Sequence, residues 1–210
     1  MPERRIIDIS RSISERTAVW PGDTTFSRRP VMQLAQGCSC NVSTYTLSAH
    51  TGSHADAPRH FVEGAADSAQ CALDAYWGPC LVVATRNPLC VSIDDIAGID
   101  LAAEQRLLFR TPNAPADDVW NDDFSFIHPD VARAAAQAGV RLLGIDTPSV
   151  DPMTSKTLET HKLLLRGRVA ILESLDLSAV PPGRYELCAL PLKIDGGDAS
   201  PVRAVLRVLG

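Results

Sequence analysis

The sequence predicts an α/β fold in a single domain, with a mixed, strand-rich sheet and few helices. Short apolar runs of strand character outnumber the segments with helical periodicity. No linker, internal repeat or low-complexity tract divides the sequence into two halves. The 210 residues, of which 45% are hydrophobic, are enough to form one buried core. We therefore expect one globular domain that spans residues 1–210.

The first half of the chain contributes mainly strands and turns. Arg5 to Ile9 alternates weakly between apolar and polar residues, which favours a short strand. Trp20-Pro21-Gly22-Asp23 has the Pro-Gly centre of a type II turn, so Trp20 is expected either half-buried at the surface or in the wall of a ligand pocket. Asn41 to Ala49 is rich in β-branched residues and predicts a strand that ends at His50. Further strands are expected at residues 80–85 and 105–110, with a capped helical turn at residues 92–96.

The second half combines helices and strands. Residues 112–126 are polar and predict a long surface loop. His128-Pro129-Asp130 places a proline in the first turn of an Ala-rich helix that ends at Gly139. The turn-rich stretch Asp146 to Pro152 follows a buried strand, at the end where α/β sheets usually contact their ligands. A second helix is expected at residues 158–166, and strands are expected at residues 140–145, 169–172, 184–192 and 202–208.

Composition limits the partners. The net charge is −5 and no run of Lys or Arg occurs, which argues against a nucleic acid or an anionic membrane surface. A small molecule is therefore the expected ligand. We find no signal-peptide pattern and no apolar run long enough for a membrane span, and the six cysteines are scattered. These features predict a cytoplasmic protein with free thiols.

The stretch His50 to Phe61, HTGSHADAPRHF, holds three of the five histidines. Imidazole and carboxylate groups bind zinc and its neighbours, and a catalytic ion keeps one position for water. His50, His54 and Asp56 supply such a ligand set at short spacing. The stretch therefore predicts a metal site.

The backbone of this stretch is expected to be a strand end that passes into a loop. Gly52 and Pro58 interrupt it, which disfavours a helix, and Pro58 restricts the chain just before His60. Thr51 stands where an H-E-x-x-H metalloprotease helix has its glutamate, so that class is excluded. A loop of this kind can fold the three ligands around one ion.

A second ion would need ligands from elsewhere in the chain. Asp56 has two oxygens and could bridge two ions. His128 opens a helix, so a surface role is expected for it, whereas His161 follows the turn-rich loop. Glu173 closes a buried strand, where a carboxylate is costly unless a cation meets it. The alternative is that His161 is half-exposed on its helix and Glu173 is a surface acid.

These residues resemble a known signature. HTGSHADAPRHF is similar to the H-x-G-T-H-x-D-x-P-x-H-F pattern of the cyclase-like metal-dependent hydrolases, and Ser53 stands where that pattern has Thr. The likeness extends over nearly the whole chain, and within the family it points to the bacterial kynurenine formamidases. The flanking matches are Asp8 to Ser10, Trp20 to Asp23, Gly144 to Asp151, His161, Glu173 and Ser200 to Ala204.

The resemblance implies a fold, a cofactor and an assembly. The fold is a swivelling β/β/α arrangement, and the assembly is a homodimer. The cofactor is two Zn²⁺ ions per subunit, with Mn²⁺ or Co²⁺ as alternatives. The resemblance implies one ion on His50, His54 and Asp56, and a second on Asp56, His161 and Glu173.

The resemblance also implies a reaction, the hydrolysis of N-formyl-L-kynurenine to L-kynurenine and formate in tryptophan breakdown. His60 matches the catalytic histidine of the family and is expected to move the proton; alternatively, it is a third ligand or orients one. Trp20 and Phe61 are expected to line the pocket for the aromatic ring. Two other functions stay open: hydrolysis of a cyclic amide such as isatin, and metal binding without turnover.

Overall fold

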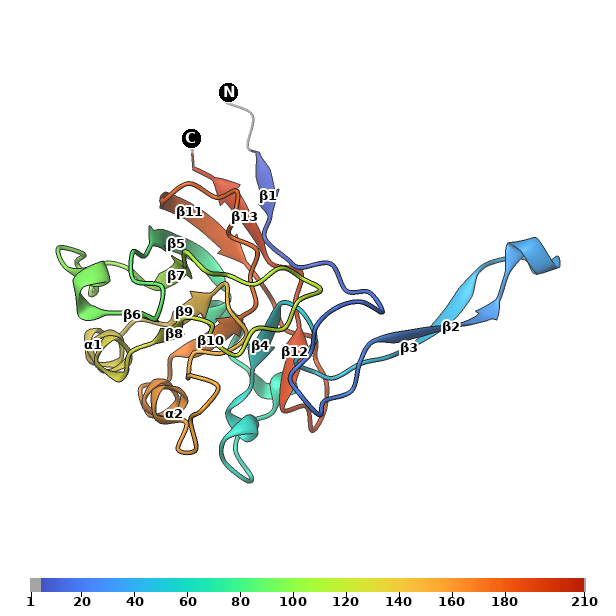
Figure 1. The fold of residues 1–210 in the computed structure, drawn as a ribbon, viewed down its shortest axis with the longest axis horizontal. Coiled ribbons are helices and arrows are strands. Elements are labelled where there is room, and N and C mark those ends of the chain that lie inside the picture. Colours follow the sequence, from blue (N-terminus) through green and yellow to red (C-terminus); the bar gives the residue numbers. More distant parts are fainter. Residues whose placement is uncertain (1–4, 210) are drawn as a thin grey trace.

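The computed structural model describes residues 5–209, and a nine-stranded sheet forms its centre. In spatial order the strands are β1 (Ile6–Asp8), β13 (Val205–Val208), β11 (Gly183–Cys188), β5 (Trp77–Ala84), β7 (Arg106–Arg110), β9 (Leu142–Ile145), β10 (Ala170–Glu173), β4 (His54–Asp56) and β12 (Ala199–Pro201). The strands β5, β7, β9 and β10 are parallel neighbours, and the other pairs are antiparallel. The predicted mixed, strand-rich sheet is therefore confirmed (Figure 1).

Two α-helices in the described chain lie on one face of this sheet, α1 (Pro129–Ala138) before β9 and α2 (Glu159–Arg166) before β10 (Figure 1). The first begins and ends where the sequence predicted. The His128 ring accepts the N–H of Asp130 at the start of α1, and Gly139 takes a left-handed conformation with φ of 77° at its end. Within residues 5–209, no helix has the length and apolar character that crossing a bilayer requires.

The two faces of the sheet pack into two apolar clusters. Leu143 and Ile145 of β9 contribute to the cluster that contains Val131 of α1 and Leu164 of α2. Leu142, their neighbour on the same strand, belongs to the cluster on the opposite face. Because successive side chains of a strand point to opposite faces, a strand covered on both sides is apolar throughout. This burial explains the continuous apolar run that identified β9 in the sequence.

Shorter elements complete the fold. The predicted helical turn at residues 92–96 is a 3₁₀ helix in which Ser92 and Asp95 form a capping box. The polar stretch 112–126 is a loop up to β8 (Phe126–Ile127), which pairs with β6 (Cys90–Val91). The 3₁₀ helices are η1 (Leu34–Gln36), η2 (Pro58–His60), η3 (Ser68–Gln70), η4 (Leu73–Ala75) and η5 (Ile93–Ile96).

A hairpin of β2 (Ser27–Met32) and β3 (Val42–Thr46) projects from the body of the molecule (Figure 1). The sequence predicted a strand over residues 41–49 that ends at His50, and this prediction is wrong in its extent. The strand ends at Thr46, and a turn follows in which the N–H of Thr51 donates to the carbonyl of Ser48 at 3.1 Å. His50 therefore lies in a turn, and β3 belongs to the projecting hairpin.

The expected loop around His54 and Asp56 is also corrected by the structure. Residues His54–Asp56 form β4, a buried strand with β10 on one side and β12 on the other. A strand of three residues is too short to show a periodic pattern, and both of its partners come much later in the chain. The sequence therefore located the ligands but not the sheet that carries them.

Candidate metal centre

The pairing of β4 with β10 brings three predicted ligands together. His54 is the register partner of Glu173, so the two side chains share one face of the sheet. His54 Nε2 lies 3.2 Å from Glu173 Oε2. Asp56 points to the same face because it follows His54 by two residues on a strand. All three side chains are buried.

His50 and His161 complete two groups around Asp56. His50 Nδ1 lies 3.3 Å and His54 Nε2 lies 3.5 Å from Asp56 Oδ1. His161 Nε2, on α2, lies 3.5 Å from Asp56 Oδ2 and 3.1 Å from Glu173 Oε1. The ligand atoms within each group lie within 4.8 Å of one another, so each group could hold one ion. Asp56 presents one oxygen to each group.

Burial distinguishes between the two interpretations of His161 and Glu173. Each residue is only 4% exposed, which contradicts the alternative of a half-exposed histidine and a surface acid. His128 is exposed at the start of α1 and is not part of either group. The structure therefore brings together the five residues named as ligands and leaves His128 outside.

Hydrogen bonds fix the rings of His54 and His161. His54 Nδ1 donates to the carbonyl of Gly52 at 2.9 Å, and His161 Nδ1 lies 2.6 Å from Asp151 Oδ2. A carbonyl and a carboxylate can only accept, so each Nδ1 carries the proton and each Nε2 is free to bind an ion. Asp151 also accepts the backbone N–H of His161 at 3.0 Å. The sequence placed Asp151 only in a turn-rich loop after a buried strand and did not predict this contact.

The chemistry of the cluster fits a divalent metal ion. His54 Nε2 and both carboxylate oxygens of Asp56 are buried without a hydrogen-bond partner. Leaving buried polar atoms without partners costs free energy, and native proteins rarely do so. Nitrogen and oxygen donors in such an arrangement suit zinc and related ions.

The pKa values in this cluster reflect the close contact between its histidines and its carboxylates. Burial opposes charge on His50, but contact with Asp56 raises the pKa of His50 to about 9. Burial also opposes charge on His161, yet the hydrogen bond to Asp151 and the contact with Asp56 raise its pKa well above the usual value. Against the effect of burial, His161 and His50 hold the pKa of Asp56 well below its usual range. Binding a divalent ion would therefore displace protons from these histidines.

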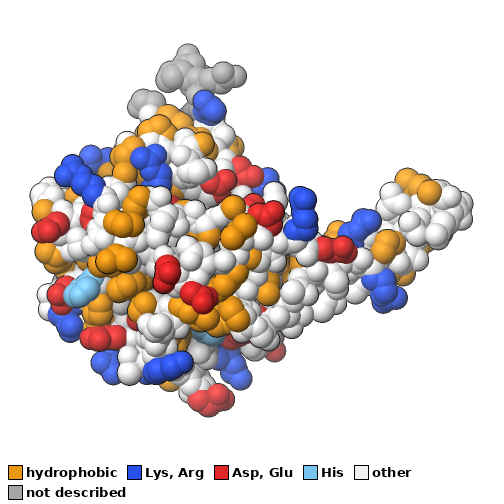
Figure 2. Space-filling view, in the orientation of Figure 1, with side chains coloured by type: hydrophobic (Ala, Val, Ile, Leu, Met, Phe, Trp, Pro, Cys, Tyr) orange, Lys and Arg blue, Asp and Glu red, His pale blue; other side chains and the backbone are white. Residues whose placement is uncertain are grey.

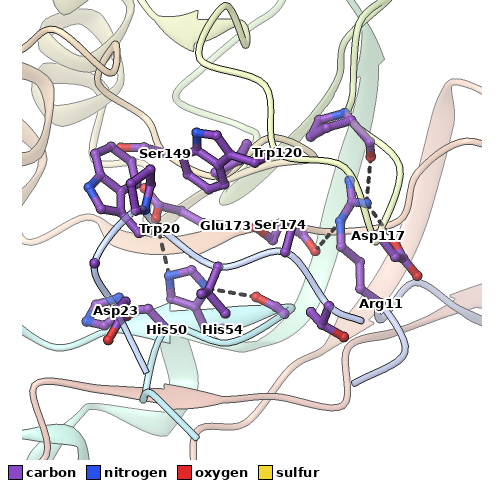
Figure 3. Close-up of a pocket in the computed structure, with 18 of the residues that line it drawn as sticks. Arg11, Trp20, Asp23, His50, His54, Asp117, Trp120, Ser149, Glu173 and Ser174 are labelled. Atoms are coloured by element: carbon purple, nitrogen blue, oxygen red, sulfur yellow. Dashed lines mark hydrogen bonds and ion pairs between the residues drawn. The ribbon is translucent and has the colours of Figure 1, made fainter. Parts of the chain in front are cut away.

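A cavity of about 500 Å³ opens over the cluster, and Trp20, Phe61 and Trp120 are among its walls. The predicted type II turn fixes Trp20: the N–H of Asp23 donates to the Trp20 carbonyl at 2.9 Å, and Gly22 has φ of 91°. The two indoles meet edge to face with centroids 5.3 Å apart. Figure 3 shows Trp20 and Trp120 on one side of the cavity and His50 and His54 on the other. Trp20 is thus part of the cavity wall and at the same time 38% exposed, so both expected descriptions fit it.

His60 lines the same cavity from η2, beside the metal cluster. Its Nδ1 lies 3.6 Å from Asp198 Oδ2. The Phe61 ring adjoins both His60 and His161, and its centroid lies 4.4 Å from the centroid of the first ring and 4.5 Å from that of the second. Asp198 and Trp120 were not predicted as site residues. Both lie in polar loops without a local motif, so only the fold places them near the cluster.

A hydrogen-bond network behind the cluster holds Glu173 in place. Ser174, the next residue, has the unusual φ of 54°. Its carbonyl accepts from the Ser53 hydroxyl at 2.6 Å and from Arg11 Nε at 3.1 Å. The Ser53 hydroxyl also accepts the N–H of Arg11 at 2.9 Å. Arg11 forms an ion pair with Asp117 as well, visible in Figure 3.

The fold and the cluster together define a class. Imidazole and carboxylate groups at the floor of an aromatic cavity, carried by a mixed α/β sheet, are typical of a metal-dependent hydrolase of small molecules. Residues 7–152 match the family model described as putative cyclase. The chain belongs to this cyclase family, as its signature predicted.

Several relatives are similar over their full length. The kynurenine formamidase of Bordetella avium is 46% identical over 209 residues, which cover 99% of this chain and 100% of the relative. The kynurenine formamidase of Maricaulis maris is 45% identical over 204 residues, which cover 96% of this chain and 97% of the relative. A solved structure described as a potential metal-dependent hydrolase with cyclase activity has a TM-score of 0.86 and 32% identity, with 99% and 100% covered. Isatin hydrolase A from Labrenzia aggregata shares the fold, with a TM-score of 0.79, 22% identity, and 98% and 94% covered.

Proposed function

We propose that this protein is a metal-dependent arylformamidase that hydrolyses N-formyl-L-kynurenine to L-kynurenine and formate in tryptophan breakdown. The observation that carries the proposal is the cluster of three histidines and two acids, all buried except the partly exposed His50, beneath a cavity with aromatic walls. The names of the relatives that are 45% and 46% identical support the choice of substrate.

The proposed cofactor is two Zn²⁺ ions per subunit, with Mn²⁺ or Co²⁺ as alternatives, since the same nitrogen and oxygen donors accept all three. His50, His54 and Asp56 would hold one ion, and Asp56, His161 and Glu173 the other, which the two ligand groups support. A bound ion would lower the pKa of a coordinated water to about 7 and polarise the carbonyl of the substrate.

His60 is the proposed proton carrier. It faces the cavity beside the cluster, and burial lowers its pKa, which favours the neutral imidazole at pH 7. His60 accepts a proton from the attacking water as the oxygen bonds to the formyl carbon. It returns that proton to the anilide nitrogen as the carbon–nitrogen bond breaks, so formate and the aromatic amine leave.

Trp20 and Phe61 are the proposed walls for the aryl ring, and the structure adds Trp120 to them. All three line the cavity, and the Phe61 ring lies next to both His60 and His161. Aromatic faces and edges attract an aryl ring beyond the gain from burial alone. The ring would therefore bind against the indoles with the formamide towards the cluster.

The decisive experiment is metal analysis of the purified protein together with a formate-release assay on N-formylkynurenine. We expect bound metal and turnover that chelation abolishes and added metal restores. A parallel assay on isatin separates the two hydrolases, because ring opening there yields no formate. Turnover of isatin alone would replace the proposed substrate. Bound metal without hydrolysis of any amide would indicate a metal-binding protein without turnover.

The role of His60 is tested by comparing His60→Ala with His54→Ala. We expect retained metal and lost turnover in the first variant, and lost metal in the second. His128→Ala, at an exposed position outside the cluster, serves as the control with full activity. Loss of metal in both variants would make His60 a ligand and remove it from proton transfer.

We also propose a homodimer, and the β2–β3 hairpin supports it. The hairpin projects from the body and carries the exposed apolar side chains of Val31, Leu34, Val42 and Tyr45, so that Figure 2 shows apolar patches along it. A second copy would cover this surface. Light scattering should report twice the chain mass for the wild type and a monomer for Val31→Glu/Tyr45→Glu; a wild-type monomer would contradict the proposal.

For the location we propose the cytoplasm, which keeps thiols reduced and so suits six free cysteines.

A further inference from the structure

Asp198 lies immediately before β12, next to the cavity floor. The N–H of Ala57 donates to its carbonyl at 2.9 Å, and the following residue, Ala199, is the register partner of Asp56. The backbone of Asp198 is therefore fixed to the strand that carries the ligands. Its carboxylate is about half exposed, and Asp198 is not among the described residues that line the cavity.

One oxygen of this carboxylate faces two histidines. Asp198 Oδ2 lies 3.1 Å from His50 Nε2 and 3.6 Å from His60 Nδ1. The two imidazoles are themselves adjacent, with ring centroids 4.2 Å apart. Among the described residues, Asp198 is the one carboxylate that forms an ion pair with His60. The carboxylate thus contacts both rings although Asp198 is not one of the described residues that line the cavity.

A carboxylate at this position determines which nitrogen of each ring carries the proton. An ionised carboxylate can only accept, so it favours a proton on His50 Nε2 and on His60 Nδ1. The opposite nitrogens then remain unprotonated. His50 Nδ1 is the atom that faces Asp56, and His60 Nε2 would be the nitrogen free to accept a proton. Enzymes that use a histidine as a base often fix its tautomer with a carboxylate in this way.

We propose that Asp198 is a positioning residue that holds His50 and His60 in these tautomers, so that one carboxylate orients both a metal ligand and the proton carrier. The inference rests on the proposed function, since it takes His60 as the group that moves the proton. The His60 contact of 3.6 Å is longer than a hydrogen bond. Such contacts commonly shorten when substrate binds.

A third metal ion is the competing occupant of this group. The donor atoms of His50, His60 and Asp198 also lie within 4.8 Å of one another. An ion there would need His50 to lose its Nε2 proton while its Nδ1 faces the other ligand group, which requires an imidazolate between two cations. The carboxylate–imidazole contact needs no such deprotonation, so the geometry favours positioning.

The test compares Asp198→Asn with the control Asp195→Asn, an exposed acid three residues earlier in the same loop. We expect Asp198→Asn, assayed at a metal concentration that saturates both ligand groups, to lower kcat about 10- to 100-fold with KM unchanged, which is the usual cost of losing such an orienting partner. Asp195→Asn should match the wild type, and Asp198→Glu should restore part of kcat. Full kcat in Asp198→Asn would overturn the proposal.

A second measurement does not depend on the substrate. Nitrogen-15 NMR of the five histidines in the metal-loaded protein reports the tautomer of each ring, and His60→Ala assigns the His60 signals. We expect the His60 proton on Nδ1 in the wild type and a shift towards Nε2 in Asp198→Asn. A wild-type proton on Nε2, or a third equivalent of metal that Asp198→Asn loses, would overturn the proposal. If the wild type fails to hydrolyse N-formylkynurenine, the proposed function fails, while the NMR result still decides the tautomer.

Discussion

Divalent metal should raise the thermal stability of this protein, because the proposed ligands come together only in the folded chain. Three of their atoms, His54 Nε2 and both oxygens of Asp56, are buried without a hydrogen-bond partner. An ion that binds only the folded state adds about 4.1 kcal/mol to the free energy of unfolding at a free concentration of 1,000 times its Kd. For a chain of 210 residues, each kcal/mol corresponds to roughly 2–4 °C in Tm. Chelation should therefore lower Tm by roughly 8–16 °C under these conditions.

The assay is thermal unfolding followed by circular dichroism, with and without chelator. Mn²⁺ is the better probe, because the six cysteines of the unfolded chain would bind zinc and reduce the shift. Asp56→Asn should lose the shift, and His128→Asn should keep it. The quantity to compare is the shift within each variant, since removing Asp56 also changes the stability of the ion-free protein. An equal shift in Asp56→Asn, or none in the wild type, would refute binding at the cluster.

Three further predictions concern the surroundings of the site. Asp151→Asn should weaken metal binding about 10- to 100-fold in a chelator competition, because Asp151 orients His161. An unchanged metal affinity would show that the 2.6 Å contact between Asp151 and His161 does not contribute to metal binding. Burial raises the pKa of Asp146 to about 6, against the hydrogen bonds from Thr111. The Asp146 carboxyl thus binds its proton more tightly in the folded state than in the unfolded state. The free energy of unfolding should therefore fall by about 3 kcal/mol as the pH rises from about 4 to 6, and Asp146→Asn should lack this pH dependence in urea unfolding. Trp120→Ala should raise the KM for an aryl formamide about 2- to 12-fold, because it removes an aromatic contact of about 0.5–1.5 kcal/mol. The KM for an aliphatic formamide should not change.

Local signals in the sequence were sufficient for the helices and the buried parallel strands. The start of α1 is marked by His128 and Pro129 and its end by Gly139, and each acts through the backbone nearby. The strand β9 is covered on both faces, so its apolar run is unbroken. The strands β4 and β12 have three residues each and pair with segments far away in the chain, so no periodic pattern could identify them.

The same distinction applies to the site. His50, His54 and Asp56 were recognisable because three potential metal ligands occur within seven residues. Asp198 and Trp120 stand alone in polar loops, and nothing in their neighbours separates them from surface residues. Asp198 lies next to His50 and His60 because β12 pairs with β4, and Trp120 reaches the cavity because the loop 112–126 packs against Trp20. Such contacts between distant segments arise from the fold as a whole.

The charges in the cluster assign different tasks to chemically identical side chains. Asp56 and Glu173 are buried with pKa values below their usual range, so both are ionised at neutral pH and need compensating positive charge. Protons on His50 and His161 can supply it, since the pKa values of both are raised, and bound divalent ions would supply it in place of those protons. His60 differs, because burial lowers its pKa and its ion-pair partner within residues 5–209 is the half-exposed Asp198. Unlike His50 and His161, His60 therefore favours the neutral form at pH 7, and a neutral imidazole at the cavity is what proton transfer from water requires.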